Sequence, residues 1–167
     1  MFRTISDFEQ NWTYEMSSTQ KMMDQLTDAS LSQAVVEGHR TLGRMAWHII
    51  TTIPEMMEHC GLKVTSVKKD APVPGTADEI KKAYGAVSKE LLDGIKADWN
   101  DESLMVEDEM YGEKWMRGIS LLILIKHEIH HRAQMTVLMR QAGLKVPGIY
   151  GPSKEEWAAF NAPVPEI

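Results

Sequence analysis

Two histidines stand one helical turn apart in residues 126–132, which read KHEIHHR. Residues four apart on a helix are neighbours, with Cβ atoms about 5–6 Å apart. His127 and His131 can therefore direct two imidazoles at one metal ion, as zinc sites require. Two histidines that directly follow the apolar stretch 119–125 would be costly to bury without partners, and a metal ion is one such partner. The alternative is a pair of ligand-free histidines on the exposed end of a helix.

The same residues match the H-E-x-x-H pattern of zinc metallopeptidases, in which the glutamate, here Glu128, is the general base. A peptidase site needs a third ligand further along the chain, for which Glu155 or Glu156 would be the candidates. No segment shows the alternation of a strand that could bind a peptide, so a peptidase is the less favoured interpretation. A di-iron bundle is excluded, because it needs two Glu-x-x-His motifs and the chain has one, at 128–131.

Four segments carry the hydrophobic spacing of helices: residues 6–26, 41–59, 76–95 and 115–141. The stretch 119–125 is apolar on nearly every side, which indicates a helix in the centre of a bundle. Residues 100–112 are acidic and without a regular pattern, and a short last helix is expected after Ser153. The pattern predicts an all-α protein, a four-helix bundle with a short C-terminal helix.

Two capping boxes mark helix starts, because a Ser or Thr three residues before a Glu satisfies free N–H groups of the first turn. They are Ser6 with Glu9 and Thr76 with Glu79. We therefore expect the first helix to begin at Ser6 and the third at Thr76.

Length and composition narrow the class of protein. A chain of 167 residues with 43% hydrophobic residues fits one domain, residues 1–167. A net charge of −6 argues against nucleic acid as the main partner. The single cysteine, Cys60, excludes an intramolecular disulfide and fits a reducing compartment. The charged N-terminus does not resemble a signal peptide, and no apolar run approaches the ~20 residues of a membrane span. We expect a cytoplasmic protein that binds no membrane.

Three motifs, in this order along nearly the whole chain, resemble the DinB superfamily. They are TLGRMAWHI at 41–49, HEIHHRAQ at 127–134, and LMRQAGL at 138–144 followed by VP and YGP. The histidine spacing with the trailing arginine and glutamine is the most specific part. The resemblance implies an up-up-down-down four-helix bundle, often dimeric, and the family name does not imply DNA binding.

The resemblance also implies one divalent metal ion held by His48, His127 and His131. Helical periodicity alone would describe His48 as a partly exposed histidine beside the apolar stripe, so its assignment as a ligand comes from the resemblance. Three protein ligands with open positions are typical of a catalytic site, and imidazole ligands favour zinc or nickel. Activities among relatives are thiol transfer and isomerisation with low-molecular-weight thiols such as bacillithiol, mycothiol or glutathione.

Two further residues of the second motif could take part in catalysis. Glu128 could act as a base or orient water, or it could be a surface carboxylate on the far side of the helix. Arg132 could bind a substrate carboxylate, although a salt bridge between helices or subunits is the simpler role. Gln134 is expected to support the fold through a hydrogen bond, and His130 to lie at the edge of the site.

The sequence thus predicts a metal-dependent enzyme that acts on a small molecule, as a thiol S-transferase or a hydrolase, and that forms a homodimer. A low-molecular-weight thiol would be the co-substrate of the transferase. The alternative from another class is a non-catalytic, metal-binding dimeric bundle that binds a partner or ligand. A zinc peptidase of the H-E-x-x-H type is the third possibility.

Overall fold

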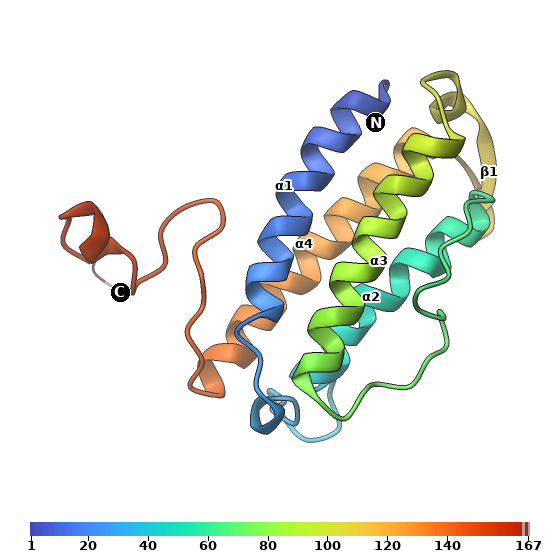
Figure 1. The fold of residues 1–167 in the computed structure, drawn as a ribbon. Helices are drawn as coiled ribbons and strands as arrows, with labels where there is room; N and C mark the ends of the chain where they lie inside the picture. The colour runs from blue at the N-terminus through green and yellow to red at the C-terminus, as the bar shows by residue number, and fades with distance from the viewer. Residues whose placement is uncertain (165, 167) are drawn as a thin grey trace.

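The computed structural model describes residues 1–164 and 166, and its core is a bundle of four long helices (Figure 1). The helices are α1 (Ile5–Met23), α2 (Leu42–His59), α3 (Ala77–Asp98) and α4 (Arg117–Gln141). The shorter elements are η1 (Asp28–Ser30), η2 (Glu102–Met105), η3 (Trp157–Phe160), β1 (Glu107–Met110) and β2 (Glu113–Met116). The predicted all-α four-helix bundle is confirmed, and the last short helix is the 3₁₀ turn η3.

The order of helix directions differs from the expected up-up-down-down. Helix α1 lies parallel to α4 (Figure 1), and the residues at their starts lie close together, because the Phe2 N–H donates to the Gly118 carbonyl at 3.1 Å. Helix α1 lies antiparallel to α3, and α2 antiparallel to α4, so α1 and α4 run one way and α2 and α3 the other.

The lengths of the connections could not have predicted which helices run in the same direction. The three connections, residues 24–41, 60–76 and 99–116, are of similar length, but only the second one runs back along the whole bundle (Figure 1). The first and third reverse the chain at one end, which makes the order up-down-down-up.

Three threonines cap the helices that begin in the first half of the chain. The Thr41 and Thr76 side chains accept hydrogen bonds from the backbone N–H groups of Arg44 and Glu79, and Thr76 is the predicted cap. The first helix is capped by Thr4 instead of Ser6, since the Thr4 hydroxyl accepts from the Asp7 N–H. Each of these threonine hydroxyls satisfies a free backbone N–H group in the first turn of its helix.

A β-hairpin precedes α4, where no regular structure was expected. Strands β1 and β2 are antiparallel, with Met110 opposite Glu113, and the two turn residues Tyr111 and Gly112 both have positive φ, 54° and 84°. Positive φ at both positions defines the tight turn that joins two twisted strands. Residues 107–110 are mostly acidic and lack the alternation of apolar and polar residues by which a strand is predicted, so the sequence did not indicate this hairpin.

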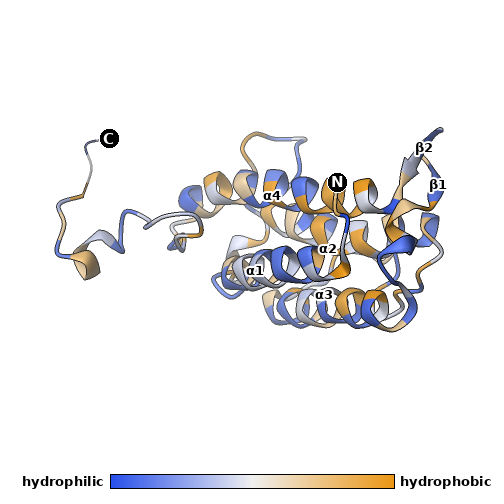
Figure 2. Ribbon diagram, turned by 90° about the horizontal axis from the view of Figure 1, so that it is seen from above, coloured by the Kyte–Doolittle hydropathy of each residue, from blue (hydrophilic) through white to orange (hydrophobic). Residues whose placement is uncertain are grey.

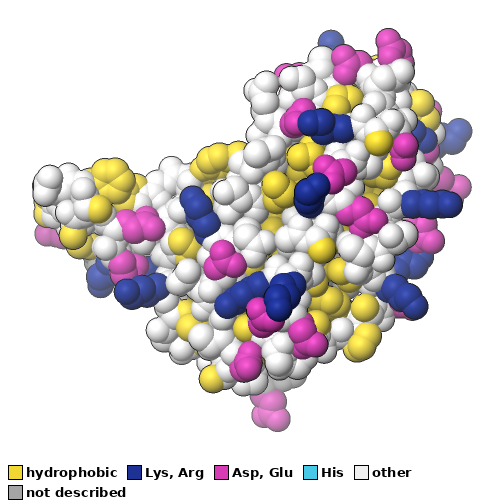
Figure 3. All heavy atoms as spheres, viewed as in Figure 1, with side chains coloured by type: hydrophobic (Ala, Val, Ile, Leu, Met, Phe, Trp, Pro, Cys, Tyr) yellow, Lys and Arg dark blue, Asp and Glu magenta, His cyan; other side chains and the backbone are white. Residues whose placement is uncertain are grey.

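The apolar core lies between the four helices, with Phe8, Trp12 and Tyr84 among its fully buried side chains. After Gly143 the chain still packs on the bundle as far as Tyr150, whose hydroxyl donates to Glu15, and the residues that follow extend to one side (Figure 2). The face over α1 and α3 mixes basic with acidic side chains, and no histidine is visible there among the residues drawn (Figure 3). No helix in the described part of the chain is long and apolar enough to cross a membrane.

Candidate metal centre

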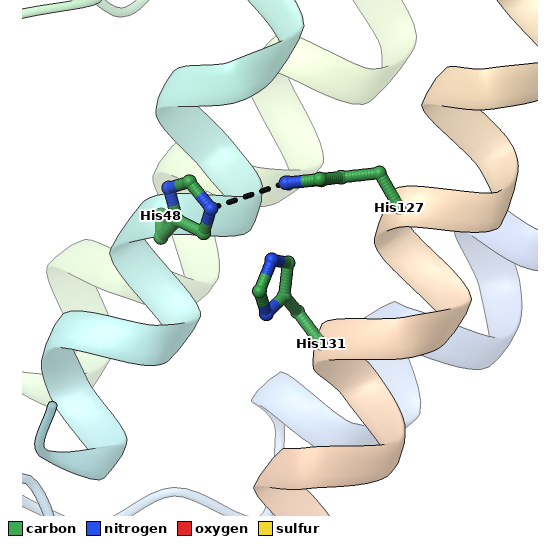
Figure 4. Close-up of side chains that lie close together, drawn as sticks. All are labelled: His48, His127 and His131. Atoms are coloured by element: carbon green, nitrogen blue, oxygen red, sulfur yellow. Dashed lines mark hydrogen bonds between the residues drawn. The ribbon is translucent and has the colours of Figure 1, made fainter.

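Helices α2 and α4 bring three histidines to one point between them (Figure 4). His48 comes from α2, and His127 and His131 come from successive turns of α4. One ring nitrogen of each residue lies within 4.8 Å of those of the other two, and the Nε2 atoms of His48 and His127 are 3.1 Å apart. The antiparallel packing of the two helices thus joins residues 79 positions apart in the chain.

The surroundings of the cluster favour neutral imidazoles. Burial, together with the positive charge of Arg40 and the neighbouring rings, lowers the pKa of His48 to about 3. Burial and the other histidines lower the pKa of His127 to about 4, and burial also lowers the pKa of His131. All three rings are therefore uncharged near pH 7, with lone pairs that a metal ion can accept.

Gln134 fixes the tautomer of His131. Its amide oxygen Oε1 lies 2.7 Å from the His131 Nδ1 atom, while its amide nitrogen Nε2 lies 3.1 Å from the His130 Nε2 atom. A carbonyl oxygen can only accept, so Nδ1 of His131 carries the hydrogen and Nε2 keeps its lone pair. Such a partner behind a ligating histidine sets the ring orientation and raises its basicity. The predicted hydrogen-bonding role of Gln134 thus extends to the cluster itself.

The donor set suits a divalent transition metal. Within residues 1–164 and 166 the cluster contains three imidazoles and no carboxylate or thiolate. Imidazole ligands suit zinc, copper, iron and nickel, whereas magnesium and calcium prefer oxygen. Three protein ligands leave positions for a small molecule. The residues present therefore fit the divalent metal ion that the family resemblance implies.

Glu128 lies outside this cluster, in the interior of the bundle. It is 1% exposed, and its Oε1 atom accepts hydrogen bonds from the Thr19 hydroxyl at 2.7 Å and the Tyr84 hydroxyl at 2.8 Å. Its Oε2 atom has no partner among the described residues, and burial raises the pKa of this carboxyl. From the sequence, Glu128 was expected either beside the metal or on the surface. Instead, its side chain lies inside the bundle, where its partners Thr19 and Tyr84 belong to α1 and α3.

Arg132 is buried in the same network instead of facing a substrate. Its guanidinium forms a salt bridge with Glu15, at 2.6 Å, and donates to the Thr19 hydroxyl at 2.9 Å and the Tyr150 hydroxyl at 2.8 Å. The inter-helix salt bridge is thus the role that the structure gives to Arg132. Sequence reasoning missed Glu15, although it lies on the same helical face as Trp12 and Thr19, where a charged residue among apolar ones indicates a buried partner.

The glutamates proposed as a third peptidase ligand have other partners. Glu155 pairs with Arg140, and Glu156 accepts hydrogen bonds from the backbone N–H groups of Gly148 and Ser153. His48 stands where a third ligand would be needed, and the glutamate of the H-E-x-x-H pattern points into the bundle. The geometry therefore gives no support to a peptidase.

Comparisons with known proteins identify the family and the fold of the chain. The family model described as "DinB family" matches residues 1–166. The protein YrdA of Bacillus subtilis (strain 168), itself uncharacterized, is 42% identical over 167 residues, which is the whole of both chains. The solved structure of a DinB-like protein from Bacillus cereus ATCC 10987 is 49% identical, covers 90% of this chain and 100% of its own, and superimposes with a TM-score of 0.87.

A more distant structure shares the fold alone. It is the DinB-like protein YjoA of Bacillus subtilis, with 17% identity and a TM-score of 0.69, and the match covers 88% of this chain and 99% of that one.

Proposed function

The chain belongs to the DinB family, and we propose that it is a metal-dependent enzyme in which His48, His127 and His131 hold one divalent ion, zinc or nickel. The observation that carries the proposal is the convergence of three neutral imidazoles from two helices, with no other donor type among them in the described residues. Each half-buried ring turns one nitrogen toward those of the other two, and a metal ion that accepts all three lone pairs would offset the cost of burying them.

The reaction that we favour is the transfer of a small thiol to an electrophile. The ion would act as a Lewis acid, and a thiol that coordinates it is deprotonated. In the transfer, the sulfur forms a bond to an electrophilic carbon, the leaving group departs with its electron pair, and the thiol proton goes to solvent. Gln134 would keep His131 in the ligating tautomer throughout. Hydrolysis, with water in place of the thiol, uses the same residues.

A non-catalytic, metal-binding dimer that binds a partner or ligand is the second candidate. Two grooves away from the histidine cluster, of about 600 and 590 Å³, lie beside the 60–76 connection and between α1 and α3, and either could receive such a ligand. Tight metal binding and a dimer by light scattering, without turnover of any thiol or ester, would favour this candidate.

The first experiment measures metal content by mass spectrometry. We expect about one equivalent in the wild-type protein and almost none in the His48→Ala and His127→Ala variants. The control is His59→Ala, which removes a histidine that lies on α2 outside the cluster and should keep its metal. Absence of metal from wild-type protein after reconstitution would refute the proposal.

The second experiment tests thiol transfer with monochlorobimane, whose chloride a thiol displaces. Wild-type protein loaded with metal should accelerate the reaction, and His127→Ala should remove the acceleration while His59→Ala keeps it. Equal rates in wild type and His127→Ala would refute thiol transfer and leave hydrolysis or simple binding.

A further inference from the structure

Two arginines precede His48 at intervals of four residues, Arg44 on α2 and Arg40 just before that helix. Arg44 precedes His48 by four residues, so both side chains lie on one face of the helix. Arg40 lies a further four residues back, immediately before the N-cap Thr41. The backbone N–H groups of Leu42 and Gly43 donate to the carbonyls of Gln33 and Leu31, which fixes the chain where it enters the helix.

The positive charges of these arginines act electrostatically on the histidine cluster. Arg40 is close enough to act electrostatically on all three histidines, and Arg44, one turn before His48 on the same helix face, acts on His48. Both arginine side chains are exposed, and neither has an ion pair or a side-chain hydrogen bond within residues 1–164 and 166. Other basic residues of the protein, such as Arg117 and Arg132, are paired with carboxylates.

The charge around the proposed metal is therefore unbalanced. Three neutral imidazoles leave both charges of a divalent ion uncompensated, and the two arginines add to the positive field. The carboxylates of Glu15 and Glu128 lie behind the cluster, in the buried network with Arg132. A ligand that completes this site will be stabilised if it brings negative charge, because its charge faces the ion and two guanidinium groups at once.

We propose that Arg40 and Arg44 form an anion-binding flank of the metal centre, which selects a small-molecule substrate that carries a carboxylate or a similar anionic group in addition to the atom that reaches the histidines. The proposal rests on the proposed function, since it assumes an ion at the cluster. It deepens that function by naming the class of substrate.

The test uses binding to cobalt-loaded protein, followed by the visible spectrum of the ion. Two thiols are compared: thioglycolate, which carries a carboxylate, and 2-mercaptoethanol, which is uncharged. The ratio of their dissociation constants is measured for wild type, for the double variant Arg40→Gln/Arg44→Gln, and for the charge-matched control Lys82→Gln/Lys89→Gln, whose lysines lie exposed on α3. The comparison between variants cancels any chelation of the cobalt by thioglycolate itself.

We expect the arginine variant to lose the preference for thioglycolate by at least about fivefold relative to wild type, since each exposed charge pair contributes modestly and two act together. The control should keep the wild-type ratio, and all three proteins should bind cobalt equally. If wild type and arginine variant both bind cobalt and show the same ratio of thioglycolate to 2-mercaptoethanol dissociation constants, the proposal is overturned. Failure of the wild-type protein to bind cobalt, zinc or nickel would instead refute the proposed function, and the flank with it.

Acetate serves as the probe if neither thiol binds. Weaker binding of acetate to the arginine variant than to wild type would support the flank, although thiol transfer would then fail. Equal binding, or no binding to either, would overturn the flank as well.

Discussion

Replacing Arg132 with methionine should destabilise the protein severely, although Arg132 itself has no contact with the histidine cluster. The guanidinium is 3% exposed, and its loss removes the salt bridge with Glu15 and the hydrogen bonds to Thr19 and Tyr150. Glu15 is itself 7% exposed, so its carboxylate would be left buried without a counter-charge. Breaking a buried pair in this way costs about 3–5 kcal/mol. For a chain of this size the melting temperature should fall by on the order of 10 °C.

The assay is urea unfolding followed by circular dichroism at pH 7, with Arg140→Met as the matched control. Arg140 also pairs with a glutamate, Glu155, but the two side chains are 41% and 37% exposed. An exposed pair contributes less than about 1 kcal/mol. A second variant, Arg132→Met/Glu15→Gln, removes the orphaned charge and should recover roughly 1–2 kcal/mol of the loss.

A free energy of unfolding for Arg132→Met within about 1 kcal/mol of wild type would refute the reasoning. It would show that the guanidinium does not neutralise Glu15 and is free for another task. In that case the role first considered from the sequence, binding of a substrate carboxylate, would have to be reopened, and KM would be the parameter to measure.

Three further predictions concern single side chains. Gln134→Ala should weaken zinc binding about tenfold or more, because nothing then holds the His131 tautomer; calorimetry measures this, and an unchanged affinity would contradict it. Burial raises the pKa of the Cys60 thiol to about 11, so a disulfide reagent at pH 8 should label the folded protein far more slowly than the urea-unfolded one, and equally fast labelling would contradict the burial. Although burial opposes it, hydrogen bonds from Thr65 and Ser66 lower the pKa of Glu90 from 4.5 to about 2. The stabilisation of the folded state by this carboxylate is therefore full above pH 4.5 and disappears as the pH falls toward 2. Glu90→Gln should thus lower the free energy of unfolding by about 1 kcal/mol at pH 7 and by much less at pH 2.5. An equal loss at both pH values would disprove this linkage.

The helices and part of the cluster were predictable because they depend on local spacing. The 3.6-residue period of apolar side chains gives four helices, and the four-residue spacing of His127 and His131 gives their common face. His48 was not predictable in this way, since its partners are 79 and 83 positions away and nothing on α2 itself indicates a ligand. The family resemblance supplied it.

Long-range pairing also explains what the sequence could not indicate. The burial of Glu128 depends on Thr19 and Tyr84, which are 109 and 44 positions away on two other helices. The order of helix directions depends on which connection crosses the bundle, and three connections of similar length leave that open. The hairpin depends on a turn of Tyr111 and Gly112, and tyrosine is an uncommon choice at a positive φ.

The motif of α4 serves two sites on two faces of one helix. Each of the two clustered histidines of α4 is followed directly by a charged residue, His127 by Glu128 and His131 by Arg132, and successive residues point about 100° apart. The histidines face α2, whereas Glu128 and Arg132 face the interior between α1 and α3. The buried ion network therefore fixes the rotation of α4 about its own axis, and this rotation in turn directs the two imidazoles at His48. The arginine that follows the second histidine is thus a positioning residue: it acts on the cluster through the packing of the helix and has no contact with the histidine rings.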